Sequence, residues 1–208
     1  MSKNKVRIYV MLVILIAIIA ILVKSQIDFQ KHIIKLEKPI APAELAKMAV
    51  EKYITNKDII LTNHVAGIEK HDSGLFVSII SRKTGLRGCV GVTKPHIKNT
   101  GGEIVRLAIL TAVSDRRFPP ITKDELDDLY YIVDIMHEPE KISDLSELDP
   151  KKYGVLVKSG LKKGVVLPDL PGLTDVNVQV REAKYNGDIN EEANVDIYRF
   201  TVNRFTTS

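Results

Sequence analysis

The most constraining feature of this sequence is an unbroken apolar run at its N-terminus, residues 8–23, which contains neither a charge nor a proline. As a helix, its 16 residues rise about 24 Å, against a bilayer core about 30 Å thick. The flanking Arg7 and Lys24 can extend toward the lipid headgroups on either side. We therefore expect residues 1–24 to form a single transmembrane anchor.

Two alternatives stay open for this run. A cleaved signal peptide usually has a shorter apolar region and a small-residue cleavage site, and no such site follows here. A buried core helix is seldom apolar all round and seldom lies at a chain terminus between charges. The compact basic cluster Lys3, Lys5 and Arg7 favours a cytoplasmic N-terminus. The sequence thus predicts a single-pass membrane protein whose soluble domain is extracytoplasmic.

Beyond the anchor, the chain is electrically neutral. The formal net charge of +4 comes entirely from four basic residues within residues 1–24, which leaves 26 basic and 26 acidic residues. A neutral domain lacks the basic surface of nucleic-acid-binding proteins, so we expect no nucleic acid among its partners. The only cysteine is Cys89, which excludes an internal disulfide.

Hydrophobic periodicity in residues 42–208 predicts one α+β domain. Pro42 marks its boundary with a juxtamembrane stalk, residues 25–41. The hairpins among its strands imply antiparallel sheets with flanking helices. Helices are predicted over 43–54 and 103–113, and a further short helix begins at a capping box over 122–125. Strands are predicted over 75–81, 86–93, 130–136, 155–158, 165–167 and 198–202. The segment 174–185 fits either a strand or a helix.

The stretch 86–91, Leu-Arg-Gly-Cys-Val-Gly, is the best candidate in the sequence for a reactive site. On a strand, Arg87 and Cys89 would share one face about 7 Å apart. A guanidinium that close lowers the pKa of a thiol, which makes Cys89 a candidate nucleophile or thiolate ligand. Gly88 and Gly91 would leave room for an approaching group. A lone cysteine is also commonly a small buried hydrophobe, and that structural reading stays open.

A second candidate stretch is 114–120, Ser-Asp-Arg-Arg-Phe-Pro-Pro, where the helix predicted over 103–113 ends. Asp115 and Arg117 could act on a ligand, although a local ion pair or a helix cap is the commoner role of such residues. His96 could fold back toward Cys89 as a base. No metal-ligand spacing occurs, so no metal site is predicted.

The two stretches, in this order, resemble the AMMECR domain family, whose prokaryotic members are also called AmmeMemoRadiSam system protein A. The likeness covers roughly residues 42–206 and includes 74–78, 153–155 and 167–168. It implies a larger and a smaller lobe, with the cysteine stretch near the cleft between them. It also implies association with Memo-type and radical-SAM proteins, but it brings no settled reaction, and the cofactor stays unknown. By position, the resemblance marks Arg87, Gly88, Cys89, Gly91, Asp115, Arg117 and Phe118.

These observations predict a membrane-anchored binding or accessory component that works with Memo-type and radical-SAM partners, because no general base accompanies the cysteine in the sequence. The alternative is an enzyme that uses Cys89 as nucleophile or thiolate in the interlobe cleft, with Arg87 and Asp115 as catalytic candidates. In either case the candidate binding residues are Gly88, Gly91, Arg117 and Phe118. A purely structural role for the cysteine stretch is the third reading.

Overall fold

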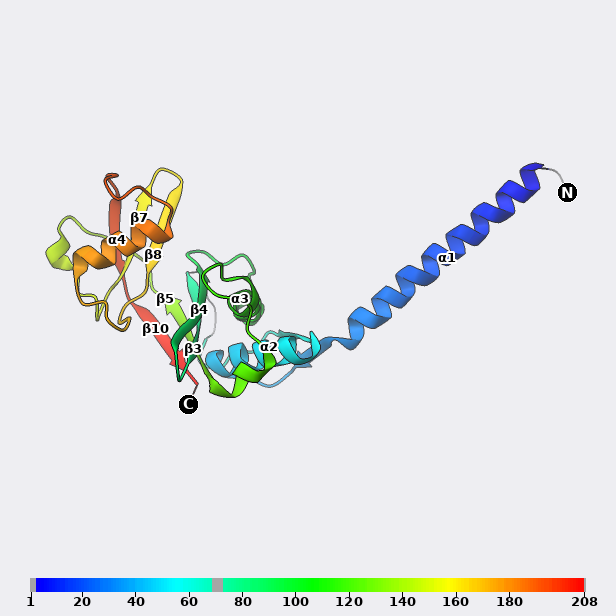
Figure 1. Cartoon of the computed structure of the whole chain (residues 1–208), viewed down its shortest axis with the longest axis horizontal. Coiled ribbons are helices and arrows are strands. Elements are labelled where there is room, and N and C mark those ends of the chain that lie inside the picture. The colour runs from blue at the N-terminus through cyan, green and yellow to red at the C-terminus, as the bar shows by residue number, and fades with distance from the viewer. Residues whose placement is uncertain (1–2, 69–72, 208) are drawn as a thin grey trace.

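The chain consists of a long N-terminal helix followed by two lobes, each built on its own antiparallel sheet (Figure 1). The computed structural model describes residues 3–68 and 73–207. Each lobe contains a four-stranded sheet and packs helices against it. The predicted α+β fold with antiparallel sheets and flanking helices is therefore confirmed.

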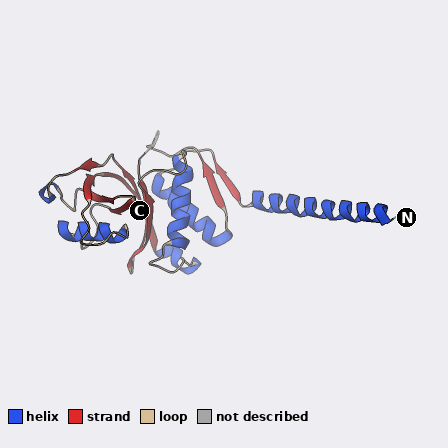
Figure 2. Cartoon of the chain, turned by 90° about the horizontal axis from the view of Figure 1, so that it is seen from above, coloured by secondary structure: helices blue, strands red, loops and turns tan. Residues whose placement is uncertain are grey.

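The larger lobe comprises β1 (Ile33–Leu36), α2 (Pro42–Asn56), β2 (Ile59–Thr62), β3 (Leu75–Ser81), β4 (Gly85–Val92), α3 (Thr100–Ser114), the 3-10 segment η1 (Lys123–Asp128), β5 (Leu129–Met136) and β10 (Val202–Thr206). Its main sheet has the strand order β10-β5-β3-β4, so β4 is an edge strand. Helices α2 and α3 cover one face of this sheet, and the parallel pair β1–β2 lies beyond them (Figure 2).

Side-chain alternation gives the main sheet two different faces. On β3, Leu75, Val77 and Ile79 are fully buried in the core that includes α2 and α3. The intervening Phe76 and Ser78 point to the opposite face, because successive side chains of a strand alternate. Phe76 belongs to a separate apolar cluster with residues of the smaller lobe. The second face of the sheet is therefore the one that meets the smaller lobe.

The smaller lobe comprises β6 (Glu140–Lys141), the 3-10 segment η2 (Leu145–Glu147), β7 (Gly154–Ser159), β8 (Lys162–Val166), α4 (Val176–Asn186) and β9 (Asp196–Phe200), with the strand order β6-β9-β7-β8. The segment that fitted either strand or helix is helix α4. The Asp175 side chain caps this helix by accepting hydrogen bonds from the backbone N–H groups of Asn177 and Val178, at 2.7 and 3.1 Å. Packing of Val180 and Ala183 into the lobe's core outweighs the strand-like alternation of its valines.

The chain crosses between the lobes at a single residue near its C-terminal end. Strand β9 lies in the smaller sheet and β10 in the larger one, and only Thr201 separates them. The prediction of one strand over 198–202 is therefore wrong in its bounds. Alternation continues across Thr201, so the sequence pattern carries no sign that the chain changes sheets. The Thr201 carbonyl accepts the N–H of His137, on the other connection between the lobes, at 2.9 Å.

Helix α1 (Lys3–Lys31) precedes the lobes and extends away from the larger one (Figures 1 and 2). The predicted anchor, residues 8–23, falls within it, although the side chains of residues 8–10, 12 and 13 lie outside the described part. Among the described residues, no helix has the combination of length and apolar character needed to cross a bilayer. In the range predicted as a stalk, residues 25–31 continue α1, whereas 33–36 form β1 and pair with β2.

Candidate functional site

A cleft of about 1650 Å³ lies between the two lobes. One wall is the second face of the larger sheet, including Ser78 and Cys89, together with the segment that follows α3. The opposite wall consists of β8, the loop after it and the end of α4, including Tyr185 and Asn186. Two separately folded sheets thus contribute to one concave site, as the family resemblance implied.

Cys89 faces this cleft because its neighbours on β4 face the core. Val90 and Val92 pack against the core of the larger lobe, which directs the alternate positions toward the smaller one. At Gly91, a Cβ would lie 1.9 Å from the Phe76 ring, and at Gly88 a Cβ would lie 2.8 Å from the Thr111 carbonyl oxygen. The two glycines therefore admit close protein neighbours, rather than leaving open space for a ligand.

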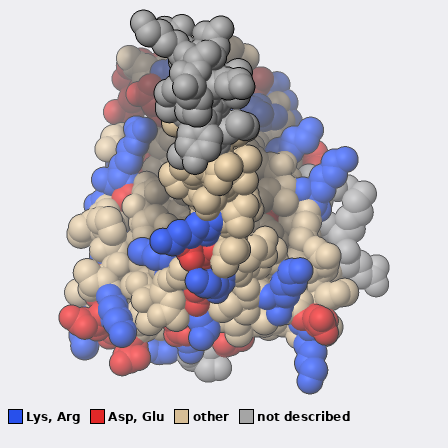
Figure 3. Space-filling view, turned by 90° about the vertical axis from the view of Figure 1, so that its right-hand side faces the viewer, with Lys and Arg blue, Asp and Glu red and all other residues tan. Residues whose placement is uncertain are grey.

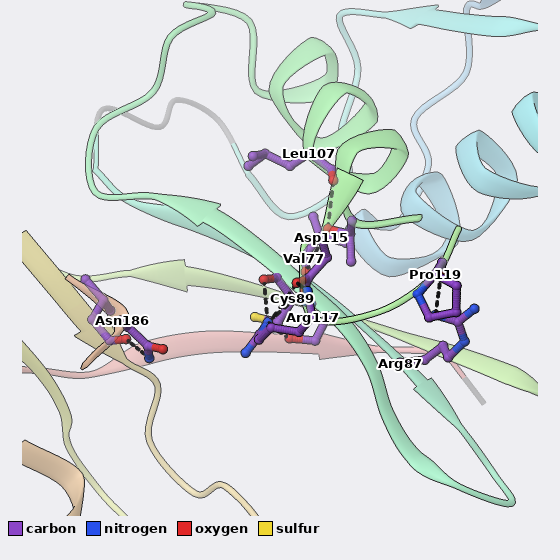
Figure 4. Close-up of polar contacts among 11 residues, drawn as sticks. Val77, Arg87, Cys89, Leu107, Asp115, Arg117, Pro119 and Asn186 are labelled. Carbon is purple, nitrogen blue, oxygen red and sulfur yellow. Dashed lines mark hydrogen bonds and ion pairs between the residues drawn. The ribbon is translucent and has the colours of Figure 1, made fainter. Parts of the chain in front are cut away.

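The backbone and side chain of Cys89 are both hydrogen-bonded. Ser78 Oγ donates to the thiol sulfur at 3.2 Å. Because β4 is an edge strand, the outward N–H and C=O groups of Cys89 have no neighbouring strand. The N–H donates to Asp115 Oδ2 at 2.8 Å, and the carbonyl oxygen accepts from Arg117 Nη2 at 3.1 Å. Asp115 and Arg117 thus cap the sheet edge at the cysteine (Figure 4).

Asp115 and Arg117 also form a side-on ion pair. Arg117 Nε donates to Oδ1 at 3.0 Å and Nη2 to Oδ2 at 2.7 Å. Burial opposes ionisation of Asp115, but the bonds from Arg117 and the backbone N–H groups of Cys89 and Arg117 outweigh it and lower the pKa of Asp115. Asp115 is also the residue at which α3 ends, so the local ion pair and helix-end role considered for it is present together with the contact to Cys89.

Burial raises the pKa of the Cys89 thiol, while the hydrogen bond from Ser78 and the charge of Arg117 act against that rise. The sequence-based expectation that Arg87 lowers this pKa is wrong in both its direction and its residue. The cation whose charge acts most on the thiol is Arg117. The thiol is therefore held in its protonated form at neutral pH.

Arg87 lies away from the thiol because a β-bulge interrupts the alternation of β4. Ile79 pairs with Gly88 and Ile80 with Leu86, which leaves Arg87 without a partner in the register. Its Nε donates to Glu125 Oε2 at 2.6 Å and its Nη1 to the Pro119 carbonyl at 2.8 Å. Figure 4 shows Arg87 beside Pro119, well separated from the group around Cys89. Arg87 therefore fastens the β3–β4 hairpin to the η1 region.

Phe118, the last residue marked by the resemblance, supports the Asp115–Arg117 turn. Its N–H donates to the Asp115 carbonyl at 3.1 Å, and its ring lies 5.5 Å from the Arg117 guanidinium carbon. Phe118 does not belong to the cleft lining found among the described residues. Its contacts in this structure are therefore with the Asp115–Arg117 turn and not with the cleft.

Sequence reasoning missed a second ion pair in the cleft, Asp134 with Arg204. Arg204 Nε and Nη2 donate to the two Asp134 carboxylate oxygens at 2.7 and 3.0 Å, and Nη2 also donates to the Pro168 carbonyl at 3.1 Å. Burial raises the pKa of Asp134, and the bonds from Arg204 oppose that rise. The one sequence signal for this pair was Asp134 itself, an acidic residue inside the apolar strand predicted over 130–136. Its partner lies on β10, 70 positions away.

Among the residues that the structure describes, no imidazole is hydrogen-bonded to the thiol. His96 lines the cleft, but within the described residues its ring makes no hydrogen bond to Cys89, whose partners are Ser78, Asp115 and Arg117. Residues 3–68 and 73–207 contain no group of three side chains suited to hold a metal ion.

Comparison with known proteins gives one consistent result. The AMMECR1 family model matches residues 43–205. A Thermotoga maritima protein is 43% identical over 159 residues, covering 75% of this chain and 91% of its own. A Clostridium acetobutylicum protein is 38% identical over 79% of this chain, which spans 36% of that longer protein. The crystal structure of the uncharacterized protein PH0010 from Pyrococcus horikoshii superposes with a TM-score of 0.69 at 26% identity, covering 79% of this chain and 89% of its own.

Proposed function

This chain belongs to the AMMECR1 family, and on that premise we propose that its interlobe cleft is a binding site through which it acts as an accessory component beside Memo-type and radical-SAM proteins. The cleft has one wall from each lobe, and its floor holds charged side chains that their partners fix in position. Such a concave, preformed surface is typical of a binding site. The partners themselves come from the family resemblance.

The state of Cys89 is the observation that favours binding over catalysis. A cysteine nucleophile acts as thiolate and is usually activated by an adjacent base or by a lowered pKa. Here burial raises the pKa, and the thiol accepts a hydrogen bond from a serine rather than donating a proton to an imidazole. The enzyme alternative requires the opposite arrangement.

The proposal includes attachment to a membrane through residues 8–23. The described large aliphatic side chains of this run, Met11 and those within 14–23, are 48–70% exposed, so the lobes do not cover them. On the face that carries α1, Lys and Arg side chains are spread among uncharged ones, with Asp and Glu side chains beside some of them (Figure 3). Lys31, Lys35 and Lys38 follow the run in sequence, and basic residues there suit contact with anionic headgroups. Anchoring would set where the cleft meets its partners.

Site-specific photocrosslinking in intact cells tests the partner proposal. A photoreactive amino acid replaces Tyr185, which lines the cleft and is 77% exposed. We expect covalent adducts with a Memo-type or radical-SAM protein, identified by mass spectrometry. Replacement of Leu161, fully exposed but outside the cleft lining, is the matched control and should give no such adduct. Equal adducts from both positions, or none from Tyr185, would contradict the proposal.

A further inference from the structure

Two arginines in the cleft share an unusual pattern of hydrogen bonds. Arg117 uses Nε and Nη2 to grip Asp115, and the second Nη2 hydrogen goes to the Cys89 carbonyl. Arg204 uses Nε and Nη2 to grip Asp134, and the second Nη2 hydrogen goes to the Pro168 carbonyl. Among the described residues, the Nη1 group of neither arginine has a hydrogen-bond partner. Each guanidinium is thus fixed on one side and has two N–H donors left.

Arginines elsewhere in the two lobes share only part of this pattern. Arg87 donates from Nε, Nη1 and Nη2 to protein groups, so every nitrogen of its guanidinium has a partner. Arg199, outside the cleft lining, also grips a carboxylate side-on, but its Nη1 donates to the Glu147 carbonyl at 3.1 Å. Arg106, outside the cleft lining, grips the buried Glu103 with Nε and Nη2 and also leaves Nη1 without a partner among the described residues. The two cleft arginines differ from it in the additional bond that fixes Nη2 to a backbone carbonyl and in facing the same cleft.

Within each ion pair the aspartate is more buried than the arginine, so the positive charge is the one that faces the cleft. The Asp115 side chain is 6% exposed and that of Arg117 is 47% exposed. The Asp134 side chain is 1% exposed and that of Arg204 is 28% exposed. The cleft lining as a whole carries six Lys or Arg residues against four Asp residues, in a domain whose total formal charge is zero. A ligand therefore meets the guanidinium of each pair before its carboxylate.

We infer that Arg117 and Arg204 form a receptor for an oxyanion, a carboxylate or phosphate group carried by the ligand of the cleft. Guanidinium N–H groups form strong charge-assisted bonds with both kinds of oxyanion. The buried aspartates fix the two guanidiniums before the ligand arrives, which reduces the entropy lost on binding. Leu170 and Pro171 on the opposite wall can receive an apolar body attached to that group. The inference rests on the proposal that the cleft is a binding site.

The experiment titrates the full-length protein in detergent micelles with phenyl phosphate and, separately, with benzoate. The readout is the NMR signal of each arginine Nε–H group, at constant ionic strength. We expect saturable shifts at Arg117 and Arg204, with a Kd of about 1 mM or tighter, and no saturable shift at Arg199. Saturation by phenyl phosphate alone identifies a phosphoryl ligand. Saturation by benzoate alone identifies a carboxylate.

Lysine variants provide the second measurement, because lysine keeps the charge that pairs with each aspartate but loses the fixed set of donors. Arg117→Lys and Arg204→Lys should each weaken binding about tenfold, whereas Arg199→Lys should leave it unchanged. The remaining Nε–H signals report whether each variant is folded.

The inference is overturned if neither probe gives saturable shifts, or if Arg199 shifts as much as the cleft arginines. It is equally overturned if both lysine variants bind like the wild type. Partner adducts from Tyr185 do not depend on these probes. Adducts without oxyanion binding would therefore refute this inference alone, and loss of both would also count against the proposed function.

Discussion

At the scale of single residues, the chemistry of the site depends on which arginine lies beside Cys89. Sequence spacing identified Cys89, Asp115 and Arg117, and the structure brings these three together. Sequence spacing could not identify the position of the Arg87 side chain, because a one-residue bulge in β4 changes the face to which the side chains on its N-terminal side point. Nor could it find the pairing of Asp134 with Arg204, which depends on how two distant strands align.

The first prediction at this scale concerns the reactivity of Cys89. Because burial raises its pKa, the folded protein should react with iodoacetamide more slowly at pH 8 than a free thiol with a pKa of about 8.5. Each unit by which the pKa is raised lowers the thiolate fraction about tenfold, and the rate should still be rising with pH above about 9. Mass spectrometry of the alkylated chain across a pH series measures this.

The same chain unfolded in urea is the control and should follow the free-thiol profile. An apparent pKa below about 8.5 in the folded protein would instead favour the enzyme alternative. In that case Cys89→Ser should also abolish turnover of any substrate found. On the binding proposal, Cys89→Ser leaves the Tyr185 adducts intact.

At the scale of elements, the periodic patterns of the sequence predicted those helices and strands whose formation depends on which of their faces is buried. Strand β3 and helix α2 appear within two residues of the predicted bounds, since alternation and the spacing of Leu45 and Ala49 reflect which face is buried. The helical state of α4 was left open because its valines alternate as in a strand. Its Asp175 cap and its packing on β8 are contacts that the pattern does not contain.

Gly91 supplies a prediction for strand β4. A Cβ at this position would lie 1.9 Å from the Phe76 ring, so Gly91→Ala must displace the ring that links the two lobes. We expect a loss of about 1–3 kcal/mol in the free energy of unfolding, as for other overpacked sites. Urea unfolding of the full-length protein in mild detergent, followed by circular dichroism, measures it.

Gly102→Ala is the matched control for that experiment. Its Cβ would meet nothing closer than 3.4 Å, and alanine is favoured over glycine in a helix by about 1 kcal/mol. Gly102→Ala should therefore leave stability unchanged or raise it. If Gly91→Ala proves as stable as wild type, close packing of Phe76 on β4 is not what requires glycine there.

At the scale of the whole molecule, the proposed anchor, residues 8–23, would set where the cleft operates. The two-lobed domain accounts for the family match over 43–205, and the apolar run lies outside it. The cleft lining found among the described residues contains none of this run. Under the anchor proposal, changes within residues 8–23 should therefore alter the location of the protein without altering the cleft.

A prediction for the anchor follows from the cost of a charge in lipid. Ile16→Arg places a guanidinium at the centre of the run, which costs about 2.5–3.5 kcal/mol for insertion of the segment. We expect the wild type in the membrane fraction and more of the variant in the soluble fraction, measured by ultracentrifugation and immunoblotting. Protease added outside intact spheroplasts should digest the wild-type domain, in accordance with an extracytoplasmic position.

Ser25→Arg is the control, because a charge just beyond the run lies among the headgroups and should not release the protein. Recovery of the wild type in the soluble fraction would refute the anchor. Digestion only after the spheroplasts are opened would place the domain on the cytoplasmic side.

The crossing at Thr201 has a consequence for how this protein is made. Strand β10 is synthesised after the smaller lobe, yet it forms one edge of the larger sheet by pairing with β5, and Thr207 closes that edge on Tyr131. The edge of β5 therefore stays open throughout translation of the smaller lobe. Because exposed strand edges favour aggregation, a nascent chain of this kind gains from an early attachment that keeps it apart from its copies. Residues 8–23 precede both lobes in the chain, so the proposed anchor would provide that attachment before either lobe is complete.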